Sequence, residues 1–184
     1  MNPLRAETGR IDELRIVPAR STDLAQYIDV MEEIAEWLER RRIKQWRAGS
    51  FRLSVDYYAD SIQQQEVQLA FIGDQLVGTL RVLLREPIVW PEVADDDSVY
   101  VHSLAVRRVW AGQGLGLRML EWAGNRAVSI DRSYVRLDCM ANNEFLRRYY
   151  EQAGFADRGE IEARFPEPVG TLRLQRYEKR VDAE

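Results

Sequence analysis

Three alternating glycines directly after a short apolar strand are the feature that most constrains this sequence. The predicted strand ends at Val106, and the turn that follows carries Gly112, Gly114 and Gly116 at the start of a predicted helix. Glycines let the backbone approach a ligand closely, and the unpaired N–H groups of a helix N-terminus favour an anion such as a pyrophosphate. Such a turn also occurs simply to pack a helix tightly on a sheet. By itself, therefore, it leaves both interpretations open.

The rest of the chain shows hydrophobic spacing typical of mixed strands and helices, without an internal repeat. Strands are predicted over residues 14–17, 67–72, 76–84, 99–106, 135–140, 155–165 and 170–180, and helices over residues 24–41, 55–64, 115–129 and 142–152. Residues 67–84 form a hairpin around Gly73, and residues 86–97, with two prolines and an acidic run, are expected to be an exposed connection. This order predicts a single α+β domain over residues 1–184, with a flexible segment at residues 1–12.

Composition argues against several classes of function. The 184 residues hold 26 Lys and Arg against 30 Asp and Glu, so no basic field suited to nucleic acid is expected. The only cysteine, Cys139, excludes an internal disulfide and a cysteine-rich metal site, and its neighbours Val135 and Leu137 predict a core thiol. No apolar run approaches the ~20 residues of a membrane span, and the polar start lacks the apolar stretch of a signal peptide. A cytoplasmic protein without a membrane partner is the expectation.

A second motif lies downstream of the glycine turn. Asn143 precedes a predicted helix that carries Tyr149 and Tyr150 and ends at Gly154 and Phe155. With the strand and the glycine turn before it, this sequence closely resembles the GNAT acyltransferase superfamily. That family has a strand ending in Val, an (Arg/Gln)-x-x-Gly-x-Gly loop and, further on, Asn with a Tyr before Gly-Phe. The resemblance covers residues 14–180 as an order of elements. One position departs from the pattern, because Ala111 stands where the family usually has Arg or Gln.

The resemblance implies an α+β fold with a central mixed, mostly antiparallel sheet that is splayed at an acyl-CoA site and carries helices on both faces. It also implies acetyl-CoA as cosubstrate and no metal. The backbone of Leu104, Ala105 and Val106 would pair with the pantetheine arm like an added strand. Amides of the turn would hold the pyrophosphate, namely those of Ala111, Gly112, Gln113, Gly114, Leu115, Gly116 and Leu117.

The same resemblance assigns the second motif to the pantetheine arm and the sulfur. Asn143 would hydrogen-bond the arm, and Tyr150 would stand near the sulfur and give a proton to the departing thiolate. Phe145, Leu146, Tyr149 and Tyr150 also form an apolar stripe at helical spacing. Tyr149 is therefore expected in the core, and a core position is the alternative for Tyr150.

The only histidine, His102, is the candidate general base. A base is needed because an amine with a pKa near ~10 arrives protonated at neutral pH. Alternation along the strand places His102 on the face of Tyr100, Leu104 and Val106. The run from Tyr100 to Val106 resembles the arylalkylamine N-acetyltransferase branch, where two histidines at this spacing relay the proton through water. Tyr100 replaces the first, leaving a hydroxyl that can order water but is a poor base. A histidine hydrogen-bonded inside the sheet is the alternative.

Aromatic residues mark the expected acceptor side. In this family the first helices and the loop before the central strand line the acceptor pocket, and here they carry Trp37, Trp46, Tyr57, Tyr58 and Trp90. The acidic run Asp95, Asp96 and Asp97 could attract a cation, so a small organic amine is the expected acceptor. The alternatives are core tryptophans and a solvated acidic loop.

The predicted function is N-acetyl transfer from acetyl-CoA to a primary amine. The amine attacks the thioester directly, without a covalent enzyme intermediate, and a strand amide near Leu104 holds the oxyanion. A non-catalytic acyl-CoA sensor and a protein or peptide N-acetyltransferase remain the alternatives. Dimers are common among proteins of this resemblance, which leaves a homodimer open.

Overall fold

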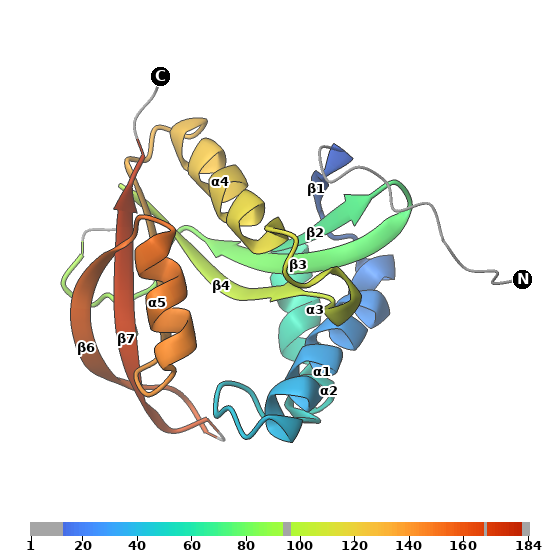
Figure 1. The fold of residues 1–184 in the computed structure, drawn as a ribbon, viewed down its shortest axis with the longest axis horizontal. Coiled ribbons are helices and arrows are strands. Elements are labelled where there is room, and N and C mark those ends of the chain that lie inside the picture. The colour runs from blue at the N-terminus through green and yellow to red at the C-terminus, as the bar shows by residue number, and fades with distance from the viewer. Residues whose placement is uncertain (1–12, 94–96, 168, 182–184) are drawn as a thin grey trace, which may run out of the picture.

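The computed structural model describes residues 13–93, 97–167 and 169–181, so the segment 1–12 and the acidic residues Asp95 and Asp96 lie outside the described residues. Its centre is a seven-stranded sheet in the order β1-β2-β3-β4-β5-β7-β6 (Figure 1). The strands are β1 Arg15–Pro18, β2 Val67–Ile72, β3 Gln75–Leu83, β4 Ser98–Val106, β5 Tyr134–Met140, β6 Ala156–Arg164 and β7 Thr171–Arg180. The helices are α1 Leu24–Arg40, α2 Ser50–Leu53, α3 Val55–Gln63, α4 Leu115–Val128 and α5 Glu144–Gln152, with 3-10 turns η2 Ser21–Asp23 and η3 Arg108–Trp110.

Local signals in the sequence account for most of these elements. The β2–β3 hairpin turns through Gly73 and Asp74, and Gly73 has a φ of 55°, which the tight turn requires and glycine adopts without strain. In α1, the buried residues Tyr27, Met31 and Ala35 recur every four residues and face the sheet. Each predicted strand and helix is found within about two residues of its expected bounds. The short helix α2 was not predicted.

The sheet consists of two parts that share a short seam. Every neighbouring pair of strands is antiparallel except β4 and β5, which run parallel. Their pairing covers only Ser98–Val101 against Tyr134–Leu137. Beyond Val101 and Leu137 the two strands separate. The predicted mixed, mostly antiparallel and splayed sheet is therefore confirmed.

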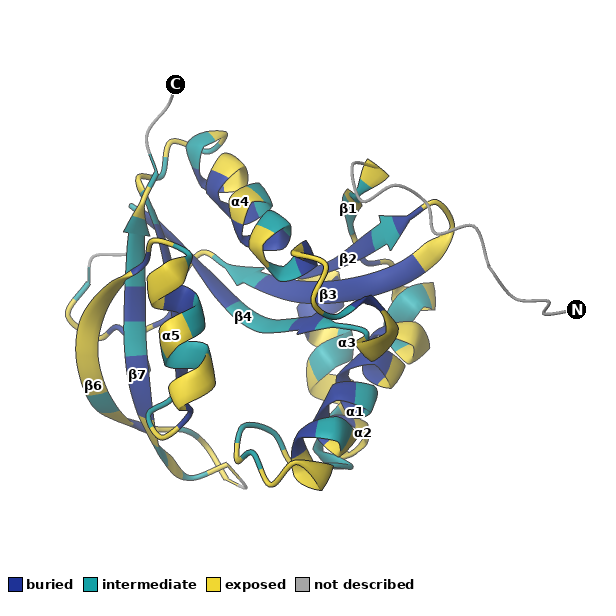
Figure 2. Ribbon diagram, in the orientation of Figure 1, coloured by how far each residue is buried: buried dark blue, intermediate teal, exposed yellow. Residues whose placement is uncertain are grey.

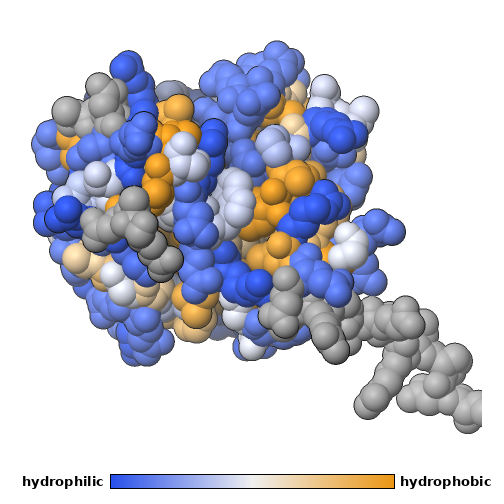
Figure 3. Space-filling view, turned by 90° about the horizontal axis from the view of Figure 1, so that it is seen from above, coloured by the Kyte–Doolittle hydropathy of each residue, from blue (hydrophilic) through white to orange (hydrophobic). Residues whose placement is uncertain are grey.

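Helices cover both faces of this sheet. α1 and α3 lie on one face of β2, β3 and β4, α4 lies on the other face, and α5 lies beside β7 in the other part of the sheet (Figure 1). The main core forms between the sheet and α4, where Val99, Val101 and Met119 are buried (Figure 2). Seen from above, apolar side chains also remain at the surface beside hydrophilic ones (Figure 3). Among the described residues, no helix combines the length and the apolar character that crossing a membrane requires.

The connection between β3 and β4 differs from the prediction of an exposed loop. Glu86, Val89 and Trp90 are buried, with Val89 fully shielded and Trp90 only 3% exposed. Val89 and Trp90 pack with Tyr100, with Ala163 of β6 and with Leu174 of β7 in a separate core. The connection folds inward because its apolar side chains cover a sheet face that lacks a helix.

Candidate active site

A β-bulge in β4 decides which side chains face the opening of the sheet. His102 pairs with Arg81 of β3 and Ala105 pairs with Thr79, so two residues of β4 oppose the single residue Leu80. The bulge includes Ser103, whose φ is 52°. Directly opposed residues share a face, so His102 and Ala105 lie on the α1 side.

Because of this bulge, the side chains of β4 do not keep the simple alternation between the two faces of the sheet that the sequence predicted. Leu104 and Val106 pack against the core beneath α4 and do not share the face of His102 and Tyr100. Gly78 of β3 makes room for the distorted strand, because a Cβ at Gly78 would lie 2.6 Å from the carbonyl oxygen of Ala105. The unpaired edge of β4 after Val101 carries the backbone of Leu104, Ala105 and Val106 that was predicted to contact pantetheine.

His102 lies between two carboxylates at the point where β4 and β5 separate. Its Nε2 is 2.9 Å from Oε2 of Glu86, and its Nδ1 is 3.7 Å from Oδ1 of Asp138. The contact with Glu86 is an ion pair when His102 is protonated. The backbone amides of Ile88 and Val89 donate to Oε1 of Glu86 at 3.3 and 3.4 Å, which fixes the carboxylate. The buried connection therefore holds a partner for the histidine.

Burial and pairing shift the proton affinities of this cluster in opposing ways. Burial acts to lower the pKa of His102, but the hydrogen-bonding and charge contributions of Glu86 and the charge of Asp138 outweigh it and raise that pKa. Burial works to raise the pKa of Glu86, and contact with His102 overcomes this and lowers it. Burial raises the pKa of Asp138 despite the nearby imidazole. The favoured arrangement is an ionised Glu86 beside His102, with Asp138 as the poorly compensated acid.

The two tyrosines predicted to act in catalysis occupy different positions. Tyr150 is 6% exposed and its ring packs against Tyr149, Phe155 and Tyr177. Burial raises its pKa, so its hydroxyl remains protonated at neutral pH and keeps a proton to donate. The charges of Cys139 and Asp138 on β5 also act to raise this pKa.

Tyr100 lies in a buried cluster instead. It is 1% exposed, packs against Trp90, and its hydroxyl is 3.5 Å from Nη1 of Arg136. It precedes the end of the β4–β5 pairing. That Tyr100 orders water stays a prediction. Its buried position favours a structural role.

The glycine turn is shaped to expose its amides. Gly112 and Gly114 have φ values of 78° and 77°, and Gly114 is the N-cap of α4. Residues 112–114 are exposed, and the first amides of a helix have no acceptor within it. A Cβ at Gly116 would lie 2.5 Å from the hydroxyl oxygen of Tyr149, so α4 and α5 approach each other here. Tyr149 therefore lies between these helices, where it is partly buried and packs against the main core.

The segment before the turn is tied to α1. Glu33 accepts a hydrogen bond from the Arg107 guanidinium at 2.6 Å and from the Arg108 amide at 2.8 Å, and the Arg108 guanidinium lies 3.9 Å above the Trp37 ring. These contacts position the turn without the arginine or glutamine that the family usually has in place of Ala111.

Asn143 joins the two sides of the opening. Its Oδ1 accepts a hydrogen bond from the Leu146 amide at 3.1 Å and caps α5. Its Nδ2 donates to Oε1 of Gln45 at 3.3 Å, and the Met140 amide donates to the same oxygen at 3.3 Å. Gln45 comes from the segment between α1 and α2, so this segment spans the opening between β4 and α5 (Figure 1). Asn143, which was predicted to bind the pantetheine arm, thus already has a polar partner.

The aromatic residues expected at an acceptor pocket divide into two groups. Trp90 belongs to the separate core beside β6 and β7, and Trp37 lies beneath Arg108. Trp46 and Tyr58 pack around Phe51 in the core between α1 and the sheet. Tyr57 and Tyr58 lie near the Arg81 guanidinium. Asp97 forms an ion pair with Arg136 at 3.1 Å. An acceptor pocket lined by Trp46, Tyr57 and Tyr58 stays a prediction.

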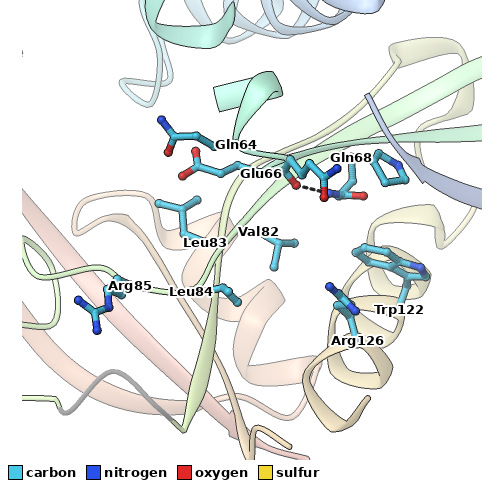
Figure 4. Close-up of a pocket in the computed structure, with 11 residues that line it drawn as sticks. Gln64, Glu66, Gln68, Val82, Leu83, Leu84, Arg85, Trp122 and Arg126 are labelled. Carbon is cyan, nitrogen blue, oxygen red and sulfur yellow. Dashed lines mark hydrogen bonds between the residues drawn. The ribbon is translucent and has the colours of Figure 1, made fainter. Parts of the chain in front are cut away.

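Among the residues that the structure describes, the other candidate sites lack an arrangement of groups that could catalyse a reaction or bind a metal. The hollow in Figure 4, between the ends of β2 and β3 and the helix α4, contains none of the predicted site residues; Gln64, Glu66, Val82, Trp122 and Arg126 are among those that line it. Cys139 is fully buried and burial raises its pKa to about 12, which agrees with a core thiol. In the described ranges, no group of three or more His, Cys, Asp or Glu side chains is arranged to hold a metal ion.

Sequence analysis missed three residues that complete the site, namely Glu86, Asp138 and Gln45. Asp138 left a signal, because it is an acidic residue on the strand that also carries the apolar Val135, Leu137 and Cys139. Glu86 and Gln45 stand in connections without a pattern, so only the fold reveals them.

Known proteins are similar to this chain in sequence or in fold. The chain is 31% identical over 147 residues, 77% of its length and 81% of the other, to the uncharacterised N-acetyltransferase YesJ of Bacillus subtilis (strain 168). A GNAT-family acetyltransferase from Listeria monocytogenes is 24% identical with a TM-score of 0.75, covering 91% of this chain and 94% of that one. The putative acetyltransferase yncA from Salmonella typhimurium, solved with its cofactor acetyl-CoA, is 15% identical with a TM-score of 0.62, covering 93% and 95%.

Residues 31–155 match the profile of the acetyltransferase (GNAT) family, and the chain belongs to that family. It is therefore an acetyl-CoA-dependent acyltransferase.

Proposed function

We propose that this acyltransferase acetylates a primary amine of a small molecule by direct attack of the amine on acetyl-CoA. The observation that carries the proposal is the position of His102, which lies at the end of the β4–β5 pairing and contacts two carboxylates. A base at this point faces the space where an amine and a thioester would meet.

The residues at the opening would each take one step of the acetyl transfer. His102 accepts a proton from the amine, directly or through water, and Glu86 stabilises the imidazolium that forms. The unpaired edge of β4 near Leu104 offers an amide to the oxyanion. Tyr150, whose pKa burial raises, gives its proton to the departing sulfur. No covalent bond to the enzyme forms in this scheme.

Binding of the cosubstrate would use the backbone and Asn143. The amides of the exposed residues 112–114 and of the first turn of α4 suit a pyrophosphate, and the free edge of β4 suits the amides of a pantetheine arm. Asn143 would exchange its contact with Gln45 for one with the arm. The residues present thus fit a CoA thioester.

The acceptor is proposed as a small molecule because Gln45 and its segment span the opening and leave less room for a peptide. Structures of the same fold include an aminoglycoside acetyltransferase in complex with coenzyme A and kanamycin, with a TM-score of 0.67, and an acetyltransferase that modifies the N-terminal serine of a ribosomal protein, with a TM-score of 0.70. The fold alone therefore does not choose between small and protein acceptors.

The proposal is tested by release of CoA thiol from acetyl-CoA in the presence of amines, polyamines, amino acids, aminoglycosides and peptides. We expect release that depends on one small-molecule class. The substitution His102→Ala should lower kcat about 100-fold or more, and Tyr150→Phe should lower it about 10-fold or more. Both variants should retain the affinity for acetyl-CoA.

Two results would count against the proposal. Tight binding of acetyl-CoA without release for any acceptor would favour a sensor, and release with peptides alone would favour a protein acetyltransferase.

A further inference from the structure

We infer that Asp138 binds the ammonium group of the acceptor, so that the site selects amines that arrive as cations. The inference rests on the proposed function, because it concerns the acceptor side of the same opening. It adds a residue that the sequence motifs did not indicate and gives that residue a part in selecting the acceptor.

The first support is an unsatisfied oxygen. Oδ1 of Asp138 is buried and has no hydrogen-bond partner within the described residues, while the side chain as a whole is only 13% exposed. Native structures rarely leave a buried carboxylate oxygen without a donor, and a catalytic part or a bound ion is among the explanations for such an exception. Asp138 is also the first residue of β5 beyond its pairing with β4, so it lies where the two strands begin to separate.

The second support is the spacing between Asp138 and His102. Oδ1 of Asp138 and Nδ1 of His102 are 3.7 Å apart, too far for a direct hydrogen bond. The other ring nitrogen faces Glu86 at 2.9 Å, which leaves Nδ1 as the one that can face a ligand. An alkylammonium nitrogen has three donors, and it can give one to Oδ1 of Asp138 and another to Nδ1 of His102.

This placement defines a balanced proton transfer. The N–H bond directed at Nδ1 breaks, its proton moves to that nitrogen, and the electron pair stays on the acceptor nitrogen for attack on the thioester carbonyl. The imidazolium so formed is compensated by Glu86. Asp138 keeps its negative charge throughout and serves to hold the nitrogen in position.

Charge balance points in the same direction. Two carboxylates, Glu86 and Asp138, face one imidazole, so the cluster keeps a negative charge when His102 is protonated. Burial raises the pKa of Asp138, and a bound cation would reverse that effect. An uncharged acceptor would leave the carboxylate unpaired.

The kinetic test uses Asp138→Asn with two acceptors of the same shape. One is the fastest acceptor of the panel, R–CH2–NH2, which is a cation at neutral pH. The other is its R–O–NH2 analogue, which is neutral there. We expect kcat/KM to fall about 10- to 100-fold for the amine, mainly through KM, and less than about 3-fold for the analogue. Asp131→Asn, in an exposed turn after α4, is the matched control and should change neither.

Equal losses for both acceptors, or no loss for either, would overturn the inference. A second measurement is independent of turnover. Because the chain has one histidine, its imidazole NMR signals report this site alone. Butylammonium should shift them in the wild type and in Asp131→Asn but not in Asp138→Asn, and the absence of a shift in the wild type would also overturn the inference. If acetyl transfer fails with every acceptor while the shift is seen, the proposed function falls and cation binding stands.

Discussion

Among single residues, the pair of His102 and Glu86 predicts how the histidine titrates. The pKa of His102 should lie above the 6.5 of a free imidazole, because Glu86 and Asp138 favour the imidazolium more strongly than burial opposes it. Glu86→Gln removes one of these charges and keeps the burial, so the pKa should fall. NMR of the single imidazole across its titration range measures this directly. Glu92→Gln, which removes an exposed partner of Arg176 from the same connection, should leave the His102 titration nearly unchanged.

The same shifts give the pair a window of pH in which it stabilises the fold. A raised pKa of His102 contributes stability that is complete below 6.5 and is lost as pH rises through the folded-state value. A lowered pKa of Glu86 contributes stability that is complete above 4.5 and is lost as pH falls through its folded-state value. The free energy of unfolding lost in His102→Gln should therefore be greatest between these two values. A loss independent of pH would contradict the pairing.

Candidate site residues could be selected from the sequence where a motif or a unique residue type marked them. His102 is the only histidine, and Asn143 stands in a recognisable pattern. The face of Leu104 was not predictable, because the bulge at Ser103 depends on how β3 pairs with β4 and on the close approach at Gly78. Glu86 meets His102 only after the connection folds inward.

Elements followed from the sequence where their signals are local. The turn at Gly73 and the cap at Asn143 fix the hairpin and the start of α5 with contacts inside a few residues. The connection after β3 was mispredicted because prolines and acidic residues are local cues to exposure. The burial of Val89 and Trp90 depends on Ala163 and Leu174, which come from strands far along the chain.

The attachment of α2 to α1 gives a prediction for an element. Glu32 of α1 is 1% exposed, and its carboxylate accepts hydrogen bonds from the amides of Gly49 at 2.7 Å and Arg52 at 2.9 Å. Glu32→Leu deprives both amides of their acceptor and should lower the free energy of unfolding by about 2–4 kcal/mol. Glu32→Gln keeps one acceptor oxygen and should cost less. Denaturant titration measures both variants.

An exposed position on the same helix serves as the control. Glu36 is 3.7 Å from Arg40 in a surface pair, so Glu36→Leu should change the free energy of unfolding by less than about 1 kcal/mol. Similar losses at Glu32 and Glu36 would mean that the amides of α2 find water when the carboxylate is removed.

For the molecule as a whole, the splayed sheet depends on a short seam. Four residues of β4 pair with four of β5, and beyond them the two parts of the sheet separate to form the site. Arg136 reinforces the seam, since its guanidinium contacts Ser98 of β4 and forms an ion pair with Glu178 of β7 at 2.7 Å. It also lies 5.2 Å from the ring centres of Trp90 and Tyr134. One buried side chain therefore links both parts of the sheet to the buried connection.

The position of Arg136 predicts that its loss weakens the whole fold. Arg136→Met keeps much of the side-chain volume but leaves Glu178, whose side chain is 13% exposed, without its buried partner. Breaking a buried pair in this way should lower the free energy of unfolding by about 3–5 kcal/mol. Arg173→Met removes an exposed pair with Glu160 on β6 and β7 and should cost less than about 1 kcal/mol. Calorimetric unfolding would distinguish the two, and equal losses would show that the seam is held by its backbone pairing alone.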